Sequence, residues 1–457
     1  MAREAGSGGF RPARDRVLDA GRSGAGPPGI AGGRRGQGRW RAMSARILIA
    51  VTHLLGIGHL VRARQLARAL AGAGHEVTLA SGGMPDGKAP TDYRFVQLPP
   101  VRTEGTDFRN LFDERGQAAT PERLAARRKQ LAALAQELSP DIVVTEHFPF
   151  GRRQLAGEFL ALLEAAKVVN PQALVLSSIR DVLVAPQRLD RLAEVAERIA
   201  TQFDAVLVHG DPRVLPLKAS WPMTPEIAGK LVYTGYLAAS AHGPHPEEPR
   251  SGVSKDAPVG FGASWSILRD AISDEMAPQD EGSKGKAGTI LVSGGGSAAA
   301  LPLFEAVLAA ARLLPARPFH LLVGRGVAET DFARLRQSAP ANAVIERARP
   351  DFPALLAGCA LSVSQAGYNT VLDLLQAGRP ALFIPFDAGN ETEQALRAAA
   401  LERAGLARVV TLAEGPQALA AAIETALARG APPAARIDLD GAAGTVAAIA
   451  RLLASRS

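Results

Sequence analysis

The sequence is poor in cysteine and has no long apolar run, although 47% of its 457 residues are hydrophobic. Its one cysteine, Cys359, excludes an intramolecular disulfide framework and a cysteine-based metal cluster, which is typical of a reducing cytoplasm. No apolar stretch approaches the ~18 residues that a membrane-spanning helix needs, and no signal-peptide run is present. We therefore expect a cytoplasmic protein of two or three domains.

Net positive charge is small outside the N-terminal tail. Residues 1–42 carry nine Arg and three acidic residues, so they account for +6 of the formal net charge of +7. The chain from Met43 onward is therefore close to neutral, which argues against a nucleic-acid partner. The tail is rich in Gly, Arg and Pro, so we predict that residues 1–42 are disordered, or that Met43 is the true start.

The segment 46–81 predicts a strand, a helix from about His59 and a second strand, the first unit of a doubly wound parallel sheet. Its turn carries Gly56 and Gly58 but lacks the third glycine of a dinucleotide fingerprint. The second strand also ends without the acidic residue that would bind the ribose of NAD. The segment therefore argues against a nicotinamide cofactor.

Ionisable residues follow three successive predicted strands, over 141–145, 173–178 and 205–208. These residues are Glu146, Arg180 and Asp211. Because the carboxyl ends of parallel strands meet at one edge of a sheet, we expect the residues to line a site for a polar acceptor. Glu146 is either a base or an ordinary surface carboxylate. Between these units we predict a strand over 94–98, a loop over 101–120 and a helix over 121–138 with Thr120 as its N-cap.

A second domain is predicted after a segment rich in Pro, Gly, Ser and charge. We expect an N-terminal domain over 43–238, a linker over 239–288, a C-terminal domain over 289–430, and a tail with a closing helix over 431–457. The C-terminal domain opens with a strand over 289–292 and the turn Gly294-Gly295-Gly296-Ser297. Glycines at a strand-helix turn let the backbone approach an anion closely.

The stretch 361–390 predicts a strand, a tight turn, a helix from Thr370 to a glycine stop at Gly378, and a strand over 381–385. The N-terminus of that helix favours phosphate. Asp373 lies one helical turn after Thr370 on the same face. Its carboxylate would repel phosphate but would accept hydrogen bonds from neutral hydroxyls such as those of ribose.

This stretch, with Gly367, Pro380, Pro385-Phe386 and the pair Glu393-Gln394, resembles the C-terminal domain of family 28 glycosyltransferases. The resemblance implies an α/β fold of the GT-B type, in which two facing doubly wound Rossmann-like domains enclose the active site in a cleft. It implies donor-binding roles for Gly294, Gly295, Gly296, Ser297, Arg349, Gly367, Asn369, Thr370, Asp373, Glu393 and Gln394. On the N-terminal side it implies that His59 is the base and that Gly56 and Gly58 face the acceptor. The strand ends add Glu146 as a second candidate base, with Arg180 and Asp211 on the acceptor side.

The resemblance implies transfer of a hexose or N-acetylhexosamine from a UDP-linked sugar to an acceptor hydroxyl, with inversion. Helix dipoles and backbone N–H groups would stabilise the departing diphosphate, so we expect neither a metal nor a cofactor. The acceptor would be a saccharide or a lipid-linked molecule, which leaves peripheral membrane contact open. Two alternatives remain: a nucleotide-sugar hydrolase or epimerase of the same fold, and a sugar-nucleotide-binding subunit without activity.

Two residues depart from the family pattern. Asp373 stands where the family usually has Glu, which puts a two-hydroxyl contact to ribose in doubt. The pair Glu393-Gln394 stands where the family member that builds the lipid-linked cell-wall precursor has two Gln. Sugar binding therefore carries over to this chain, but the identity of the sugar does not.

Overall fold

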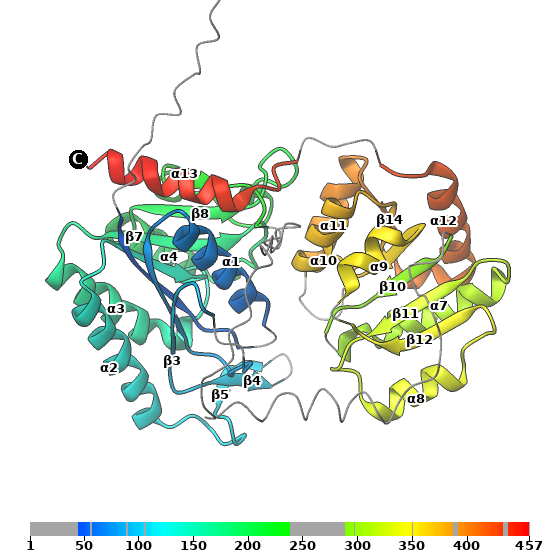
Figure 1. The fold of residues 1–457 in the computed structure, drawn as a ribbon, viewed down its shortest axis with the longest axis horizontal. Coiled ribbons are helices and arrows are strands. Elements are labelled where there is room, and N and C mark those ends of the chain that lie inside the picture. The colour runs from blue at the N-terminus through cyan, green and yellow to red at the C-terminus, as the bar shows by residue number, and fades with distance from the viewer. Residues whose placement is uncertain are drawn as a thin grey trace, which may run out of the picture. The chain divides into compact units, whose positions relative to one another are not determined.

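The first parallel sheet follows the predicted strand-helix-strand order (Figure 1). The computed structural model describes residues 44–54, 57–87, 90–104, 107–237, 288–296, 298–349, 351–386, 392–432 and 437–456. The predicted tail over 1–42, most of the predicted linker over 239–288, Gly56 and Ser297 lie outside these residues. Residues Ala42–Ser457 cluster as one compact unit.

The N-terminal sheet has seven strands in the order β3-β2-β1-β6-β7-β8-β9. They are β1 (Arg46–Val51), β2 (Glu76–Ser81), β3 (Arg94–Gln97), β6 (Ile142–Glu146), β7 (Leu174–Arg180), β8 (Ala205–His209) and β9 (Leu231–Tyr233). All neighbours pair in parallel. The helices of this half are α1 (Gly58–Gly72), α2 (Pro121–Leu138), α3 (Ala156–Val169), α4 (Leu189–Gln202) and α5 (Pro225–Ala228).

Both faces of this sheet are buried, which is why its strands read as continuous apolar runs. Along β1, Leu48 and Ala50 pack into one core cluster, and Ile47 and Ile49 pack into another on the opposite face. The alternation follows from the two-residue period of a strand. Helices therefore cover both faces, and the strand ends are left to carry polar residues.

The C-terminal sheet has six strands in the order β12-β11-β10-β13-β14-β15, again all parallel. They are β10 (Ile290–Ser293), β11 (Phe319–Val323), β12 (Ala343–Arg347), β13 (Leu361–Ser364), β14 (Ala381–Phe383) and β15 (Arg408–Val409). Its helices are α7 (Leu301–Leu313), α8 (Glu329–Gln337), α9 (Phe352–Gly358), α10 (Tyr368–Ala377), α11 (Glu393–Arg403) and α12 (Gly415–Arg429).

The closing helix α13 (Gly441–Ala454) packs on α1 of the N-terminal half (Figure 1). Ala448 and Ile449 are buried in the same cluster as Leu60 and Leu66 of α1. The chain thus returns to its first half through the predicted closing helix.

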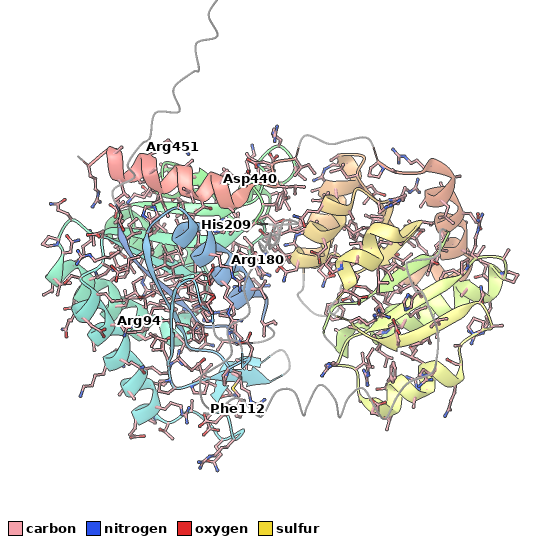
Figure 2. The ribbon with its side chains drawn as sticks, viewed as in Figure 1. Arg94, Phe112, Arg180, His209, Asp440 and Arg451 are labelled. Atoms are coloured by element: carbon pink, nitrogen blue, oxygen red, sulfur yellow. The ribbon has the colours of Figure 1, made fainter. Side chains whose placement is uncertain are left out.

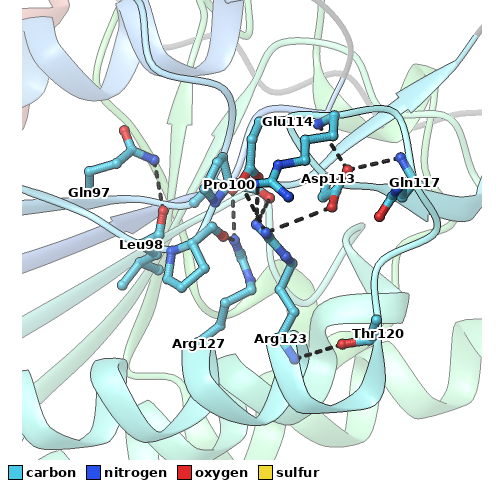
Figure 3. Close-up of polar contacts among 12 residues, drawn as sticks. Gln97, Leu98, Pro100, Asp113, Glu114, Gln117, Thr120, Arg123 and Arg127 are labelled. Atoms are coloured by element: carbon cyan, nitrogen blue, oxygen red, sulfur yellow. Dashed lines mark hydrogen bonds and ion pairs between the residues drawn. The ribbon is translucent and has the colours of Figure 1, made fainter.

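The segment 101–120 is not a plain loop, contrary to prediction. It contains an antiparallel hairpin of β4 (Arg102–Glu104) and β5 (Asp107–Phe112) with an irregular register. Polar contacts hold the return to α2 (Figure 3), where Asp113 accepts from the backbone N–H of Gln117 and Arg123 donates to Glu114. Thr120 caps α2 as predicted by accepting from Arg123 N at 3.3 Å. The hairpin lacks alternating apolar residues, so nothing in its pattern indicated strands.

Other predicted boundaries move by one or two residues. Helix α10 begins at Tyr368 and not at Thr370, with Gly367 as its N-cap residue. Its predicted end is confirmed, since Gly378 lies in the left-handed region at φ 59° and its N–H bonds to Leu374 O. Glu146 and Arg180 are the last residues of their strands and do not follow them. Among the described residues, no helix is long and apolar enough to cross a membrane.

Candidate active site

The N-terminal sheet reverses its order at β1, which pairs with β2 on one side and with β6 on the other. Ligands of doubly wound sheets bind beyond the carboxyl ends of strands at such a point. Two predicted residues lie there: His59 is in the first turn of α1, and Glu146 is the last residue of β6. The topology therefore brings together two residues that are 87 positions apart in sequence.

His59 and Glu146 form a hydrogen-bonded dyad. The distance from His59 Nδ1 to Glu146 Oε1 is 3.0 Å, and the exposed fractions of the two side chains are 14% and 2%. An ionised carboxylate can only accept, so this bond places the proton on Nδ1. Among the described residues Nε2 has no hydrogen-bond partner, and its lone pair is left for a substrate proton.

Arg62 completes this group, and the sequence analysis did not identify it. Its guanidinium pairs with Glu146 Oε1 and lies 3.1 Å from His59 Nδ1. With Nδ1 protonated, Glu146 Oε1 accepts from both His59 and Arg62. Arg62 is three residues after His59 and so lies on the same face of α1. In the sequence Arg62 stands close to Arg64, Gln65 and Arg68, so no local signal indicated its burial.

The electrostatic environment keeps His59 neutral. Burial lowers its pKa well below 6.5, and the nearby positive charges of Arg152, Arg62 and Arg180 lower it further. Burial alone would raise the pKa of Glu146, but Arg62 and the hydroxyl of Ser178 outweigh it, so the pKa is lowered and the carboxylate is ionised. A neutral imidazole oriented by a carboxylate is the arrangement of a general base.

Arg152 adds a buried positive charge that forms no ion pair with a described carboxylate, although the charge of Glu146 acts on it. It makes one hydrogen bond, from Nε to Thr52 O, and no ion pair with any described residue. Burial lowers its pKa to about 10. The His147 ring also lies at this site, and its centroid is 5.2 Å from the centroid of the His59 ring. Gly151 is required here because a Cβ would lie 2.3 Å from the His147 ring.

Arg180 and the C-terminal half meet at Glu393. Arg180 is the register partner of His209 at the ends of β7 and β8 (Figure 2), and its guanidinium lies 2.6 Å from Glu393 Oε2. Glu393 also accepts from Arg397 at 2.8 Å. The carboxylate predicted to face the sugar is therefore already bonded to two Arg side chains.

A buried ion pair lies next to this contact. Arg397 donates two hydrogen bonds to Asp181, at 2.9 and 2.8 Å, and the exposed fractions of their side chains are 1% and 0%. The pair joins α11 to the residue that follows β7. Asp211, predicted on the acceptor side, is instead engaged by Arg213 and by the backbone N–H of Asp438.

The C-terminal sheet has its own reversal point, at β10, which pairs with β11 and β13. The turn after β10 is tightly constrained at Gly294, where a Cβ would lie 2.1 Å from the Ala300 Cβ. Gly295 has φ 69° and is exposed, as is Gly296. These glycines give the exposed backbone of the turn the freedom to approach an anion.

Helix α10 begins beside the same reversal point. It has neither a side-chain cap nor an acidic residue in its first turn, so no side chain of that turn competes for its N-terminal N–H groups. Asn369 of this turn is exposed, and Thr370 is half-buried. The Asn369 amide faces Gly58 of α1, since a Cβ at Gly58 would lie 3.6 Å from it.

Asp373 lies one turn further along α10 without a partner. Its carboxylate has no hydrogen bond and no ion pair with any described residue, and burial raises its pKa to about 6. A half-buried carboxylate without a donor is costly for the folded chain. Such a cost is expected where a ligand supplies the donors.

The remaining predicted donor residues are arranged differently. Gln394 accepts from Phe386 N at 3.2 Å, and Arg349 pairs with Asp351 and Glu346. Their side chains thus support local loops in this structure. Cys359 is buried, and burial raises the pKa of its thiol to about 11. Within the described ranges, no group of three or more His, Cys, Asp and Glu residues could hold a metal ion.

Comparison with known proteins shows a family resemblance in the C-terminal half. Residues 289–447 match the glycosyltransferase family 28 C-terminal domain. The UDP-N-acetylglucosamine--N-acetylmuramyl-(pentapeptide) pyrophosphoryl-undecaprenol N-acetylglucosamine transferase of Brucella suis (strain ATCC 23445 / NCTC 10510) is 35% identical over 138 residues, which are 29% of this chain. The chain spans 36% of the length of that relative.

Solved structures match over both halves. A glycosyltransferase from Rickettsia africae ESF-5 aligns over 91% of this chain and 100% of its own, with a TM-score of 0.54 and 13% identity. MurG of Acinetobacter baumannii aligns over 89% of this chain and 99% of its own, with a TM-score of 0.52 and 18% identity. These matches show the fold: two Rossmann-like halves of the GT-B type.

Proposed function

We propose, from the premise that residues 289–447 are of the glycosyltransferase family 28 C-terminal-domain type, that this chain is a glycosyltransferase. It transfers a hexose or N-acetylhexosamine from a UDP-linked sugar to an acceptor hydroxyl, with inversion. The observation that carries the proposal is the His59-Glu146 dyad, which puts a neutral base on the fold of a sugar-nucleotide enzyme.

The donor would bind to the C-terminal half. Its diphosphate would lie against the Gly294–Gly296 turn and the uncapped N-terminus of α10, where backbone N–H groups stabilise negative charge. Asp373 would accept a hydrogen bond from ribose, and this would supply the donor that its carboxylate lacks. Because Arg180 and Arg397 each bond to one oxygen of Glu393, the sugar would contact only the acceptor positions that these two bonds leave open.

The chemical step follows from the dyad. The acceptor oxygen attacks the anomeric carbon while its proton moves to Nε2 of His59. The bond from that carbon to the diphosphate oxygen breaks, and its electron pair leaves with UDP. Glu146 stabilises the imidazolium that forms, and attack opposite the leaving group inverts the anomeric centre.

The acceptor would bind at the carboxyl ends of β1 and β6. Arg152 contributes a positive charge there without a carboxylate partner among the described residues. This surplus favours an acceptor with an anionic group, such as a phosphate-linked saccharide. A lipid phosphate is one such acceptor, and with it the chain would act at a membrane surface from the cytoplasmic side.

The test is release of UDP from a panel of UDP-sugars, with GDP- and TDP-sugars for comparison. Each donor is tried with no acceptor, with a phosphate-linked sugar and with a neutral alkyl glycoside. We expect release that depends on the phosphate-linked acceptor, and a loss of 10²–10⁴-fold in His59→Ala.

His75→Gln is the matched control, because His75 is a buried histidine that accepts from Ala45 N and lies outside the site. Release at the same rate without any acceptor would indicate a hydrolase. Donor binding without turnover, unchanged in His59→Ala, would indicate a non-catalytic binding subunit.

A further inference from the structure

Three buried side chains extend from Glu146 into the N-terminal sheet. Ser178 Oγ lies 2.6 Å from Glu146 Oε2, on the oxygen opposite the one that contacts His59. His209 Nε2 lies 3.0 Å from Ser178 Oγ, and Thr234 Oγ1 lies 2.8 Å from His209 Nδ1. Each of these residues is at most 2% exposed. The parallel register pairs Glu146 with Ser178, so the contact is built into the sheet.

The direction of each hydrogen bond in this series is fixed by Glu146, at its start. An ionised carboxylate only accepts, so Ser178 must donate to Glu146. The Ser178 oxygen then accepts from His209 Nε2, which makes Nε2 the protonated nitrogen of that ring. His209 Nδ1 is left to accept from the Thr234 hydroxyl. Every donor points toward Glu146, and hydrogen bonds aligned in this way strengthen one another.

We propose that Ser178, His209 and Thr234 are positioning residues that hold Glu146 in place for His59. The inference rests on the proposed function, since it concerns how the base is oriented. The two oxygens of Glu146 accept from different donors. Ser178 fixes Oε2, so Oε1 is presented to His59.

Arg62 explains why the carboxylate needs such a restraint. Its guanidinium is a planar fork that matches both oxygens of a carboxylate, yet here it contacts Oε1. If Oε2 were released, the carboxylate could rotate to pair with Arg62 through both oxygens. His59 would then lose its acceptor, and its proton would no longer be confined to Nδ1.

Ser178→Ala is the direct test, because it removes one hydroxyl and leaves the dyad and the donor residues intact. We expect kcat for sugar transfer to fall about 10-fold, while the UDP dissociation constant changes less than 2-fold. The effect acts through Glu146, so adding Ser178→Ala to Glu146→Gln should cost little beyond the single Glu146→Gln change.

Ser177→Ala is the matched control. Ser177 is the preceding buried serine of β7, and it donates to Phe148 O, which also accepts from Thr145. It does not contact Glu146, so we expect wild-type kcat with a similar loss of stability. A fall in kcat equal to that of Ser178→Ala would overturn the inference, because it would trace the effect to general weakening of β7.

Variants of His209 add a rescue experiment. His209→Leu removes the donor to Ser178, whereas His209→Gln keeps an N–H near the Nε2 position. We expect kcat to fall severalfold in His209→Leu and to recover at least partly in His209→Gln. Equal losses in the two variants would contradict a hydrogen-bonding role.

A readout without substrate is the ¹⁵N shift of the His59 ring, which reports its tautomer. We expect the Nδ1–H form in wild type and in Ser177→Ala, and a mixture in Ser178→Ala. The same tautomer in all three proteins would overturn the inference. If His59→Ala retains wild-type transfer, the proposed function fails and this inference fails with it. If His59→Ala loses transfer while Ser178→Ala keeps wild-type kcat, only the positioning role is refuted.

Discussion

Replacing Asp373 by Asn should stabilise the free protein and weaken its binding to UDP. Burial raises the pKa of Asp373 from 3.8 to about 6, so the folded chain disfavours the ionised carboxylate. At 1.36 kcal/mol per pKa unit this rise is worth at most ~3 kcal/mol. Because the side chain is partly exposed and solvent screens it, we expect ~1–2 kcal/mol at pH 8.

The sign of the pH dependence follows from the raised pKa. The wild-type chain has its full stability below the pKa of the unfolded aspartate, near 4, and loses this contribution as pH rises through about 6. The Asn side chain does not titrate. Urea unfolding should therefore give similar free energies for the two proteins at pH 4, and a higher value for Asp373→Asn at pH 8.

UDP binding should change in the opposite direction. The ionised carboxylate is the better acceptor for a ribose hydroxyl, and a hydrogen bond to a charged group is worth ~1.5–3 kcal/mol, or ~10–100-fold in the dissociation constant. The ratio of the two proteins' constants at each pH removes the titration of UDP itself. We expect that ratio to grow from pH 5 to pH 8.

Glu164→Gln is the control, since Glu164 is an exposed carboxylate on α3 away from α10. It should alter neither property. Equal stability of wild type and Asp373→Asn at pH 8 would refute the burial argument. Equal UDP affinity would remove Asp373 from the donor site.

Three further substitutions test the framework of the site. Asp181→Ala leaves Arg397 short of a buried partner and should lower the free energy of unfolding by ~3 kcal/mol in urea, whereas an unchanged value would mean that the pair is solvated. Gly294→Ala places a Cβ against Ala300 and should weaken UDP binding at least 10-fold by calorimetry; wild-type affinity would show that the turn does not carry the diphosphate. Gly378→Ala forces a side chain into the left-handed region, so thermal unfolding should reveal a loss of ~1 kcal/mol, and no loss would contradict that strain.

The strands of both sheets were predictable because a strand that is buried on two faces has a continuous run of apolar residues. The run from Ile47 to Val51 could hardly be anything but a buried strand, and Gly378 marked the end of α10. The hairpin of β4 and β5 was not predictable, since charged residues and glycine there give no alternating pattern.

The site was predictable only in part. His59 and Glu146 were identified from strand ends and a family resemblance. Their contact depends on which strands are neighbours in the sheet, and no local sequence pattern specifies that order. Arg62 and Arg397 resemble surface arginines in the sequence, and burial becomes evident only once their carboxylate partners are placed. Ser178 reads as an ordinary strand residue for the same reason.

Binding of a uridine nucleotide to the C-terminal half underlies every step of the proposed reaction. The most direct measurement is calorimetric titration of the chain from Met43 with UDP, GDP, TDP and NAD, alongside Asp373→Ala. We expect selective binding of UDP, at least 10-fold weaker in the variant, and no binding of NAD. Absence of UDP binding, or equal affinity in the variant, would contradict the account of the donor site.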